Sequence, residues 1–313
     1  MAAEIISSLR TGCVGADLPA IPQVSLYIPC YNAERYIAAC IEGVLAQTRR
    51  PDEILVIDDG SRDRTVEIAA RYPVRAVRHE ANRGLGAARN TAFRNAQHDL
   101  VAALDADCVP EPEWLERLLA HFSDPAIAGA GGRVEEAIQD SPADRWRKQH
   151  MPQHWGDAPV HNPRFLFGAD TIYRKSAVLE AGGYDERCRT NGEDSDISAR
   201  ISARGGVTIY DPDARAQHQR HDGVASILDT YWRWYHPAVY AGDKDPTLGR
   251  VLSTAVRYHL RGHLSMARRD LRAGRAALVP LDLLFSLYMP YRDLRFCLES
   301  RKASRPRQIP AET

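Results

Sequence analysis

The stretch Asp-Leu-Val-Ala-Ala-Leu-Asp-Ala-Asp, residues 99–107, decides the fold class. Its apolar run, residues 100–104, has the length and composition of a buried strand, and two carboxylates, Asp105 and Asp107, follow at once. Of the four Asp-x-Asp tripeptides in the chain, this one closes an apolar strand. The alternative for such a tripeptide is a solvated turn. We expect here that both carboxylates turn toward one cation, and hard oxygen ligands suit Mg²⁺ or Mn²⁺.

Short apolar runs alternate with amphipathic stretches on both sides of this segment. Upstream, strands are predicted at residues 24–28, 54–58 and 74–78, with helical periodicity in 33–47, 62–72 and 84–97. This β-α-β-α order predicts an α/β fold, a mostly parallel sheet between helices. Ligands of such sheets bind at the carboxyl ends of the strands, so the loops after the strands should hold the site.

Polar clusters follow the other predicted strands as well. Ile-Pro-Cys-Tyr-Asn (28–32) ends the first, Asp-Asp-Gly-Ser (58–61) ends the second, and Asn-Arg-Gly-Leu-Gly-Ala-Ala-Arg-Asn (82–90) follows the third. The Gly-x-Gly of the last cluster lacks the third glycine of a dinucleotide fingerprint and does not follow the first strand. A Rossmann NAD site is therefore disfavoured.

Together, these four clusters strongly resemble the family 2 glycosyltransferases, and the resemblance covers residues 24 to about 220. It implies a GT-A (nucleotide-diphospho-sugar transferase) fold and an inverting enzyme that uses a nucleotide-diphospho-sugar, most often UDP-linked. It also implies that Asp107 is the firmer ligand of a divalent metal, with Asp105 facing the metal or the ribose. Such a cation would stabilise the charge on the departing diphosphate.

The resemblance implies a set of nucleotide-contacting residues, and local structure offers alternatives for some of them. Ser61 is predicted to cap the following helix, and Tyr31 can pack on the sheet instead of stacking on a base. Glycines at 84 and 86 would let the backbone approach a ligand. The predicted nucleotide site comprises Pro29, Tyr31, Asp58, Asp59, Arg83, Gly84, Arg89 and Asp105.

The second half carries the acceptor side of the resemblance. Gly168 and Asp170 match the segment that borders donor sugar and acceptor, and Glu193 with Asp194 matches the pair whose Asp is the catalytic base. A base at the start of a helix is held in its ionised form, so we expect Asp194 to be a weak base. The alternative for this pair is ordinary acidity at a helix start.

Two further features of the second half have functional and structural interpretations. His218, after the last predicted strand (207–211), matches a histidine that completes the metal shell in relatives, and it can equally be a surface residue. Trp232 and Trp234 lie in a run of four aromatic rings within residues 231–236, which fits core packing or an acceptor contact.

Composition limits the function classes. The 313 residues carry 41 basic and 41 acidic side chains, which argues against a nucleic-acid partner. The six cysteines are scattered singly, as in free thiols of a reducing compartment, and no signal peptide or spanning segment is evident. We therefore expect a cytoplasmic protein. A sugar nucleotidyltransferase is an alternative enzyme class, but the glycine-rich loop that it would have after the first strand is missing. A catalytically silent scaffold is the other alternative.

The charge is unevenly distributed. Residues 249–313 hold 13 basic and 5 acidic side chains, a balance of +8, against −8 for residues 1–248. An apolar segment, 276–289, lies between the arginines and is too short to span a bilayer. This region is predicted either to lie on an anionic membrane surface as a peripheral contact, or to pack on the acidic domain or form a homodimer.

The predicted organisation has four parts. Residues 1–22 form a loose arm, 23–222 the GT-A domain, 223–302 a helical C-terminal extension and 303–313 a frayed tail. The least regular part of the domain, about 129–163, receives no predicted element.

Overall fold

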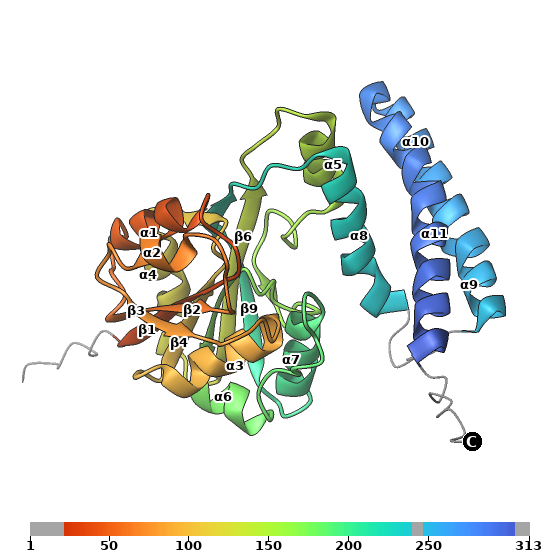
Figure 1. The fold of residues 1–313 in the computed structure, drawn as a ribbon. Coiled ribbons are helices and arrows are strands. Elements are labelled where there is room, and N and C mark those ends of the chain that lie inside the picture. The colour runs from red at the N-terminus through yellow and green to blue at the C-terminus, as the bar shows by residue number, and fades with distance from the viewer. Residues whose placement is uncertain (1–21, 240–246, 304–313) are drawn as a thin grey trace, which may run out of the picture.

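The computed structural model describes residues 22–239 and 247–303 (Figure 1). Almost all of the predicted N-terminal arm and of the predicted tail lies outside the described residues. The rest is an α/β domain followed by a layer of helices.

The first half follows the predicted β-α alternation. The elements are β1 (Val24–Cys30), α1 (Ile37–Leu45), β2 (Glu53–Asp58), α2 (Thr65–Ala69), β3 (Arg75–Arg78), α3 (Leu85–Asn95) and β4 (Leu100–Leu104). Strand β1 pairs in parallel with β2 and β4, and β2 pairs in parallel with β3. The carboxyl ends of β1, β2 and β4 therefore meet at one edge, as the sequence predicts.

The second half turns the sheet from parallel to mixed. Its elements are β5 (Cys108–Pro110), α4 (Trp114–Ala120), β6 (Ile127–Glu136), α5 (Pro142–His150), β7 (Val160–His161), β8 (Asp170–Arg174), α6 (Lys175–Glu180), α7 (Glu193–Ser202) and β9 (Val207–His218), with a short 3₁₀ turn at His121–Ser123. Strand order is β3-β2-β1-β4-β8-β6-β9-β5, with β7 paired to β9. Strand β8 is antiparallel to β4 and β6, and β9 is antiparallel to β5.

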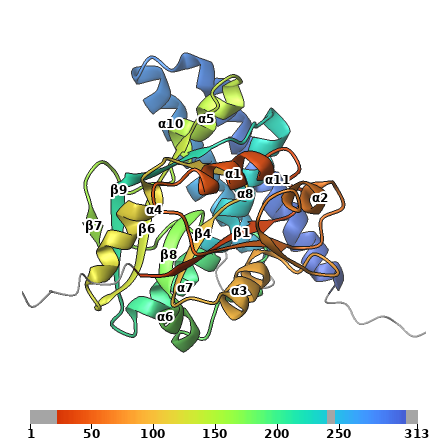
Figure 2. The same ribbon diagram turned by 90° about the vertical axis from the view of Figure 1, so that its left-hand side faces the viewer.

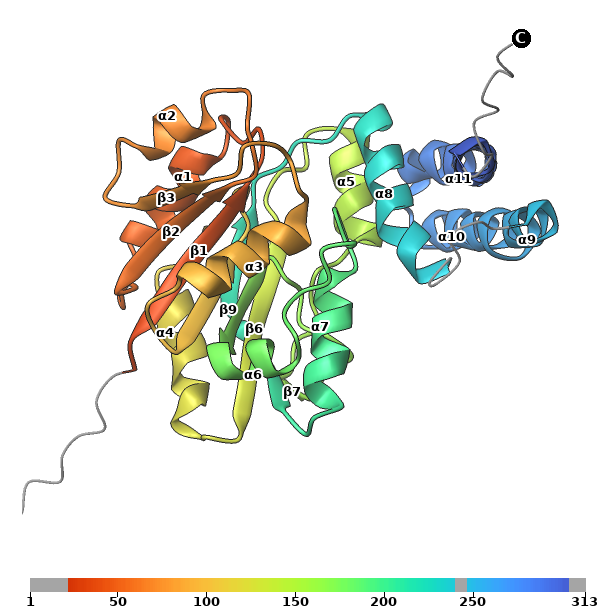
Figure 3. The same cartoon turned by 60° about the horizontal axis from the view of Figure 1, so that its bottom comes forward.

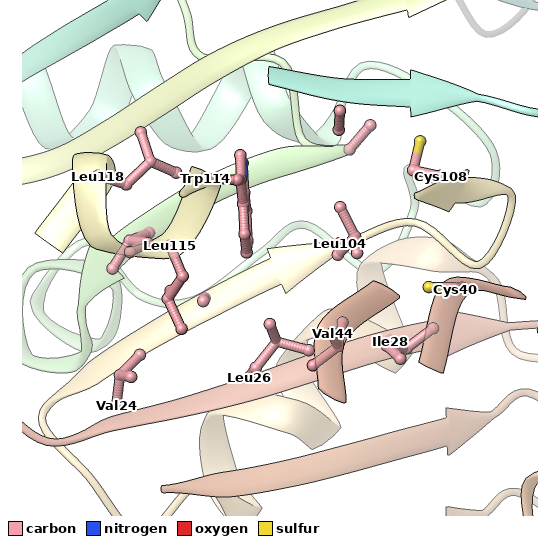
Figure 4. Close-up of a cluster of buried hydrophobic side chains, with 14 of the residues drawn as sticks. Val24, Leu26, Ile28, Cys40, Val44, Leu104, Cys108, Trp114, Leu115 and Leu118 are labelled. Carbon is pink, nitrogen blue, oxygen red and sulfur yellow. The ribbon is translucent and has the colours of Figure 1, made fainter. Parts of the chain in front are cut away.

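Helices cover both faces of this sheet. Leu26 and Ile28 of β1 pack with α1, α2 and α4, whereas Tyr27 between them packs with α3, α6 and α7. Figure 4 shows the first of these cores, in which Cys40 and Cys108 serve as small apolar side chains in the same cluster as Trp114. Successive side chains of β1 point to opposite faces of the sheet, and both faces are buried. The strand therefore has an apolar run in place of an apolar-polar alternation.

Strand β6 lies in the segment that received no predicted element. Its glycines hide it from a hydrophobicity pattern, yet they are needed for packing. A Cβ at Gly129 would lie 2.5 Å from the Tyr173 ring, and one at Gly132 would lie 2.2 Å from the Ala214 carbonyl oxygen. The strand is thus specified by close contacts with β8 and β9, not by its own apolar residues.

Beyond β9 the chain is helical: α8 (Val224–Val239), α9 (Leu248–Thr254), a π-helical turn (Ala255–Leu260), α10 (Arg261–Arg272), a 3₁₀ turn (Ala276–Leu278) and α11 (Val279–Ala303). Figures 1 and 3 show α8 with α5 next to the domain, and α9, α10 and α11 beyond them. We call α9, the π-helical turn, α10 and α11 the outer layer. Apolar residues of α5, α8 and α11 form one core, which includes Trp146, Ile227 and Phe285.

Polar contacts fasten the outer layer to α5, whose end lies beside α10 in Figure 2. His150 lies 2.8 Å from the Asp270 carboxylate, and Trp146 Nε1 donates to Asp282 at 2.8 Å. The C-terminal extension therefore packs on α5 of the domain, which is one of the predicted alternatives. None of the helices traced here combines the length and the apolar character that a membrane crossing requires.

Candidate active site

The strand ends and the start of α7 surround two adjoining cavities, of about 950 Å³ and about 410 Å³. Asp105, Asp107, Leu85 and Arg220 line both. Of the predicted site residues, the larger cavity also gathers Arg89, Gly168, Glu193, Asp194, His218 and Trp234.

Pairing of β5 with β9 brings Asp107 to His218. Cys108 lies opposite His218 in this ladder, and His218 Nε2 is 3.2 Å from Asp107 Oδ2. The other ring nitrogen, Nδ1, is 2.7 Å from Glu136 Oε2, and Glu136 also accepts from Arg147 at 2.9 Å. A carboxylate on the far side of the ring fixes the orientation in which Nε2 faces Asp107.

Charge attraction dominates this pair despite burial. Burial alone would lower the pKa of His218, but the neighbouring carboxylates of Asp107 and Glu136 raise it by more. The pKa of His218 therefore rises to about 9. Burial likewise raises the pKa of Asp107, but His218, Arg220 and Arg147 hold it below its ordinary value. Asp107 is thus an ionised carboxylate at the cavity wall.

Asp105 points toward a buried arginine. Arg89, 1% exposed, donates from Nη2 to Asp105 at 3.3 Å, from Nε to Glu193 at 3.2 Å and from Nη1 to the Tyr27 hydroxyl at 3.1 Å. Burial raises the pKa of Asp105, and the Arg89 charge opposes that rise. The role of Arg89 visible here is to link the end of β4 to the start of α7.

Asp194 lies in the first turn of α7, where the sequence places it. The helix follows Gly192, whose φ of +89° favours glycine. Asp194 accepts from the Ser195 amide at 2.7 Å and from the Gly168 amide at 3.3 Å. Two residues further along the helix, Asp196 pairs with Arg200.

The predicted weakness of this base does not agree with its surroundings. Burial raises the pKa of Asp194, and this effect outweighs the backbone amides and Arg89. The pKa of Glu193 rises to about 7 through burial and the neighbouring Asp194 charge. The expectation from the helix dipole alone omitted the cost of burying two adjacent carboxylates.

The smaller cavity is lined by Pro29 and Tyr31, together with Cys30, Asn32 and Tyr36. The Tyr31 side chain is 47% exposed, so it does not pack into the sheet. A flat aromatic ring beside a cavity that also reaches Asp105 and Asp107 is available for stacking on a nucleobase.

Asp58 and Asp59 line neither cavity and are buried among protein donors. Asp58 accepts from the Ser61 amide at 3.0 Å and pairs with Arg78 at 3.1 Å. Asp59 accepts from the amides of Arg83 at 2.8 Å and Gly84 at 2.7 Å, and from His79 at 2.7 Å. In this structure, Asp58 holds the loop after β2 and the end of β3, and Asp59 holds the loop after β3.

Arg83, Gly84 and Gly86 of the third cluster contact protein and line neither cavity. The Arg83 side chain pairs with Glu186 at the surface, at 3.0 Å. A Cβ at Gly84 would lie 2.7 Å from the Arg189 Cα, and one at Gly86 would lie 2.5 Å from the Asp185 carbonyl oxygen. These glycines make room for the segment 185–189, in place of the ligand approach that we expected.

Ser61 does not cap α2, contrary to the prediction. The helix begins four residues later, at Thr65, and its first residue has no side-chain cap before it. The Ser61 hydroxyl instead accepts from the Asn32 amide at 2.9 Å. It therefore ties the loop after β1 to the loop after β2.

Two predicted acceptor residues lie away from the cavities. Asp170 is completely buried at the start of β8, where Trp114 Nε1 donates to it, and burial raises its pKa to about 7. Trp232 donates to Asp293 at 2.8 Å, beneath the Arg292 guanidinium, and so packs between α8 and α11. Trp234, two residues along α8, faces the larger cavity instead.

Several cavity residues were not predicted. The larger cavity contains further arginines and two aromatic rings that meet edge to face, which are Arg147, Arg164, Arg187, Arg220, Arg233, Phe165 and Phe167. Phe165 and Phe167 immediately precede Gly168, so proximity to a matched motif could have indicated them. Arg147 comes from the segment without predicted elements and carries no such signal.

A separate cluster, His150, Asp270 and Asp282, is the one set of three candidate metal ligands whose donor atoms lie within 4.8 Å of one another among the described residues. Arg275 donates to Asp270 at 2.8 Å and Trp146 donates to Asp282. We interpret this cluster as the ionic fastening between α5, α10 and α11. In contrast, the donor atoms of Asp105, Asp107 and His218 do not all lie within 4.8 Å of one another.

Comparison with known proteins agrees with this geometry. Residues 25–181, half of the chain, match the model of glycosyl transferase family 2. A pre-mycofactocin glycosyltransferase of Mycobacterium tuberculosis (strain CDC 1551 / Oshkosh) is 32% identical over 183 residues, which is 56% of this chain and 39% of that protein. The chain thus spans less than half the length of this curated relative.

Two other matches cover more of the chain. A glucosyl-dolichyl phosphate glucuronosyltransferase of Haloferax volcanii is 24% identical over 241 residues, which is 69% of this chain and 77% of that protein. A mannosyltransferase of Pyrobaculum calidifontis, solved with GDP-Man and Mn²⁺, superposes with a TM-score of 0.56 at 18% identity, over 91% of this chain and 88% of that one.

The sheet order and the likeness to this solved structure define a GT-A fold. The chain belongs to glycosyl transferase family 2.

Proposed function

We propose that this protein is a metal-dependent, inverting glycosyltransferase that moves a sugar from a nucleotide-diphospho-sugar to an acceptor hydroxyl. The observation that carries the proposal is one cavity lined by both the Asp107–His218 pair and the half-buried carboxylate of Asp194. The first pair suits a cation and its diphosphate, and the second group suits proton removal.

The residues at the strand end fit a divalent cation. Asp107 is ionised, His218 presents Nε2 to it, and Glu136 steadies the ring from behind. Asp107, His218 and Asp105 would hold Mg²⁺ or Mn²⁺, which take carboxylate oxygens readily. When bound, the cation would supply Lewis-acid stabilisation of the diphosphate leaving group. Binding would release the imidazole proton, since a ligating histidine must be neutral.

The protein groups would then position the reaction and move one proton. The acceptor oxygen forms a bond to the anomeric carbon while the bond from that carbon to the diphosphate oxygen breaks. Asp194 takes the proton of the acceptor hydroxyl, and its raised pKa makes it a stronger base than an exposed aspartate. A single displacement of this kind inverts the anomeric configuration.

The smaller cavity is the proposed nucleotide-base site, with Tyr31 stacked on the base and Pro29 beside it. A UDP-linked donor is proposed from the family resemblance. Asp59 would act indirectly, because it fixes the backbone of Arg83 and Gly84.

The acceptor would lie in the part of the larger cavity bounded by Trp234, Phe165 and Phe167, whose rings can stack on sugar faces. A saccharide, a lipid-linked saccharide or another glycoconjugate is the proposed acceptor class. The likeness to the Haloferax glucosyl-dolichyl phosphate glucuronosyltransferase supports the lipid-linked form. Buried cysteines without a disulfide, such as Cys40 and Cys108, support a reducing, cytoplasmic location.

A donor panel tests this proposal. The enzyme is incubated with radiolabelled UDP-, GDP- and dTDP-sugars, with Mn²⁺ or with a chelator, and donor hydrolysis and product configuration are measured. We expect one nucleotide class to be hydrolysed only with metal. Nucleotide binding without hydrolysis or transfer would identify a silent scaffold and overturn the proposal.

A further inference from the structure

The outer layer leaves a large apolar surface in contact with solvent. On α11, the exposed residues at 280, 284, 287, 291, 294 and 298 recur every three or four positions. They form one stripe opposite the buried side of the helix, where Leu281, Phe285, Met289 and Cys297 lie. Leu287, at its centre, is 71% exposed. The six stripe positions carry no charge and extend over 18 residue steps, roughly 27 Å of helix, and the exposed Arg295 lies at the edge of the stripe near its C-terminal end.

The neighbouring α9 and π-helical turn also expose apolar side chains. Leu248, Leu252, Val256 and Leu260 recur at intervals of four and are all exposed, with Leu252 at 59%. Figures 1 and 3 both show α9 and α10 side by side with α11, on the side of α8 away from the sheet.

The exposed side of α10 is basic. His263, Ala267 and Asp270 are its buried residues, and Arg261, Arg268 and Arg272 lie on the opposite side of the helix. Arg257 precedes them in the π-helical turn and is also exposed. Among the described residues, no ion pair includes any of these four arginines.

The acidic residues of the outer layer do not balance this charge at the surface. Asp270, Asp282 and Asp293 are buried, and their partners are Arg275, Trp146 of α5 and His259 respectively. Of the acidic residues described between 247 and 299, Glu299 is the exposed one, and it pairs with Arg295 at 2.7 Å. The outward face is therefore both apolar and cationic.

We propose that this face, the outward side of α9, α10 and α11, docks on an anionic lipid bilayer. Apolar side chains can enter the boundary between headgroups and acyl chains, and the arginines can reach the phosphates. The helices would lie on the membrane without crossing it. A second copy of the chain fits less well, because a two-fold contact through the whole face would bring the same arginines together without exposed acids between them.

The proposal goes beyond glycosyl transfer and does not depend on it. Helix α8 packs against the outer layer, and Trp234 of the same helix lines the larger cavity. An acceptor presented at a membrane would thus meet a cavity whose wall is anchored to the same surface.

Vesicle co-sedimentation of the full chain tests it, with phosphatidylcholine vesicles and with vesicles that also contain phosphatidylglycerol. We expect binding to the anionic vesicles alone, reduced by added salt. The variant Arg261→Gln/Arg268→Gln/Arg272→Gln should bind on the order of 100-fold more weakly, about a factor of five for each charge. The variant Leu284→Asp/Leu287→Asp should also lose binding, although it leaves the arginines of α10 unchanged.

The matched control is Leu179→Asp, on α6 of the catalytic domain, where the leucine is 50% exposed. It should bind vesicles like the unchanged protein, and circular dichroism should give similar unfolding temperatures for all variants. Equal binding to both kinds of vesicle, or to neither, would overturn the proposal. So would a dimer in light scattering that Leu284→Asp/Leu287→Asp dissociates, since the face would then be a protein interface.

Discussion

Asp105 and Glu193 are held by one guanidinium, that of Arg89, although 88 residues of sequence separate them. One carboxylate ends the strand that leads to the proposed metal site, and the other begins the helix that carries the proposed base. The buried arginine therefore sets the spacing between the two halves of the site.

Replacing Arg89 by methionine should destabilise the fold. The substitution leaves Glu193 buried without its partner, and losing one member of a buried pair costs about 3–5 kcal/mol. Urea unfolding of Arg89→Met measures this cost. The double variant Arg89→Met/Glu193→Gln should recover part of it, because the unpaired charge is gone. Additive losses in the double variant would contradict this account.

Removing the proposed base should abolish transfer without affecting donor binding. We expect Asp194→Asn to lower kcat by roughly 10²–10⁴-fold, the usual contribution of a general base, with the nucleotide Kd unchanged. Asp196→Asn is the matched control on the same helix, since its carboxylate is engaged by Arg200. Substantial transfer by a folded Asp194→Asn protein would rule out the assignment.

Transfer should fall off at a higher pH than the ordinary titration range of an aspartate. Burial raises the pKa values of Asp194 and Glu193, the latter to about 7, so the base becomes protonated at a higher pH than an exposed aspartate. We expect kcat/KM to fall as the pH drops through this range, and Glu193→Gln to move the fall to lower pH by removing a neighbouring charge. A rate that stays constant down to the ordinary carboxylate range, about pH 4, would contradict the raised pKa.

Asp107 should couple nucleotide binding to metal. With the nucleotide at 100 times its Kd, metal-dependent binding adds about 2.7 kcal/mol to the free energy of unfolding. Thermal shift with UDP, GDP and dTDP, each with and without Mn²⁺, should show this gain in the unchanged protein and lose it in Asp107→Asn. Asp213→Asn is the control, because Asp213 belongs to another Asp-x-Asp tripeptide and is largely exposed on β9. A metal-dependent shift that survives in Asp107→Asn would place the cation elsewhere.

An added methyl group at Gly168 should disturb both halves of the site. The new Cβ would lie 2.7 Å from Arg89 Nη2 and 3.3 Å from the Asp194 Cβ. Gly168→Ala should therefore lower kcat and the unfolding temperature together. Gly262→Ala, where a Cβ meets nothing within 4 Å, should retain activity. Full activity of Gly168→Ala would show that Arg89 can move without consequence.

The sequence predicts well those parts of the fold that are local. Strand β4 and its carboxylates follow from a continuous apolar run, and α7 begins where its acidic residues indicate. Strand β6 could not be predicted, because its glycines are explained only by Tyr173 and Ala214 on other strands.

The same distinction applies to the site. The position of Asp107 beside His218 was expected from resemblance, and it depends physically on the register between β5 and β9. Asp59 was expected to face a nucleotide, but it accepts from amides 24 and 25 residues further along the chain. Single-sequence patterns do not contain such distant partners.

Helix α8 makes the boundary between domain and extension unsuitable as a cutting point. By sequence it belongs to the extension, yet Thr230, Arg233 and Trp234 form part of the wall of the larger cavity. A fragment that ends at Asp222 would keep the strand ends and lose this wall. Under the proposed function, exchange of this extension between related chains should change acceptor selectivity while the proposed catalytic carboxylates stay the same.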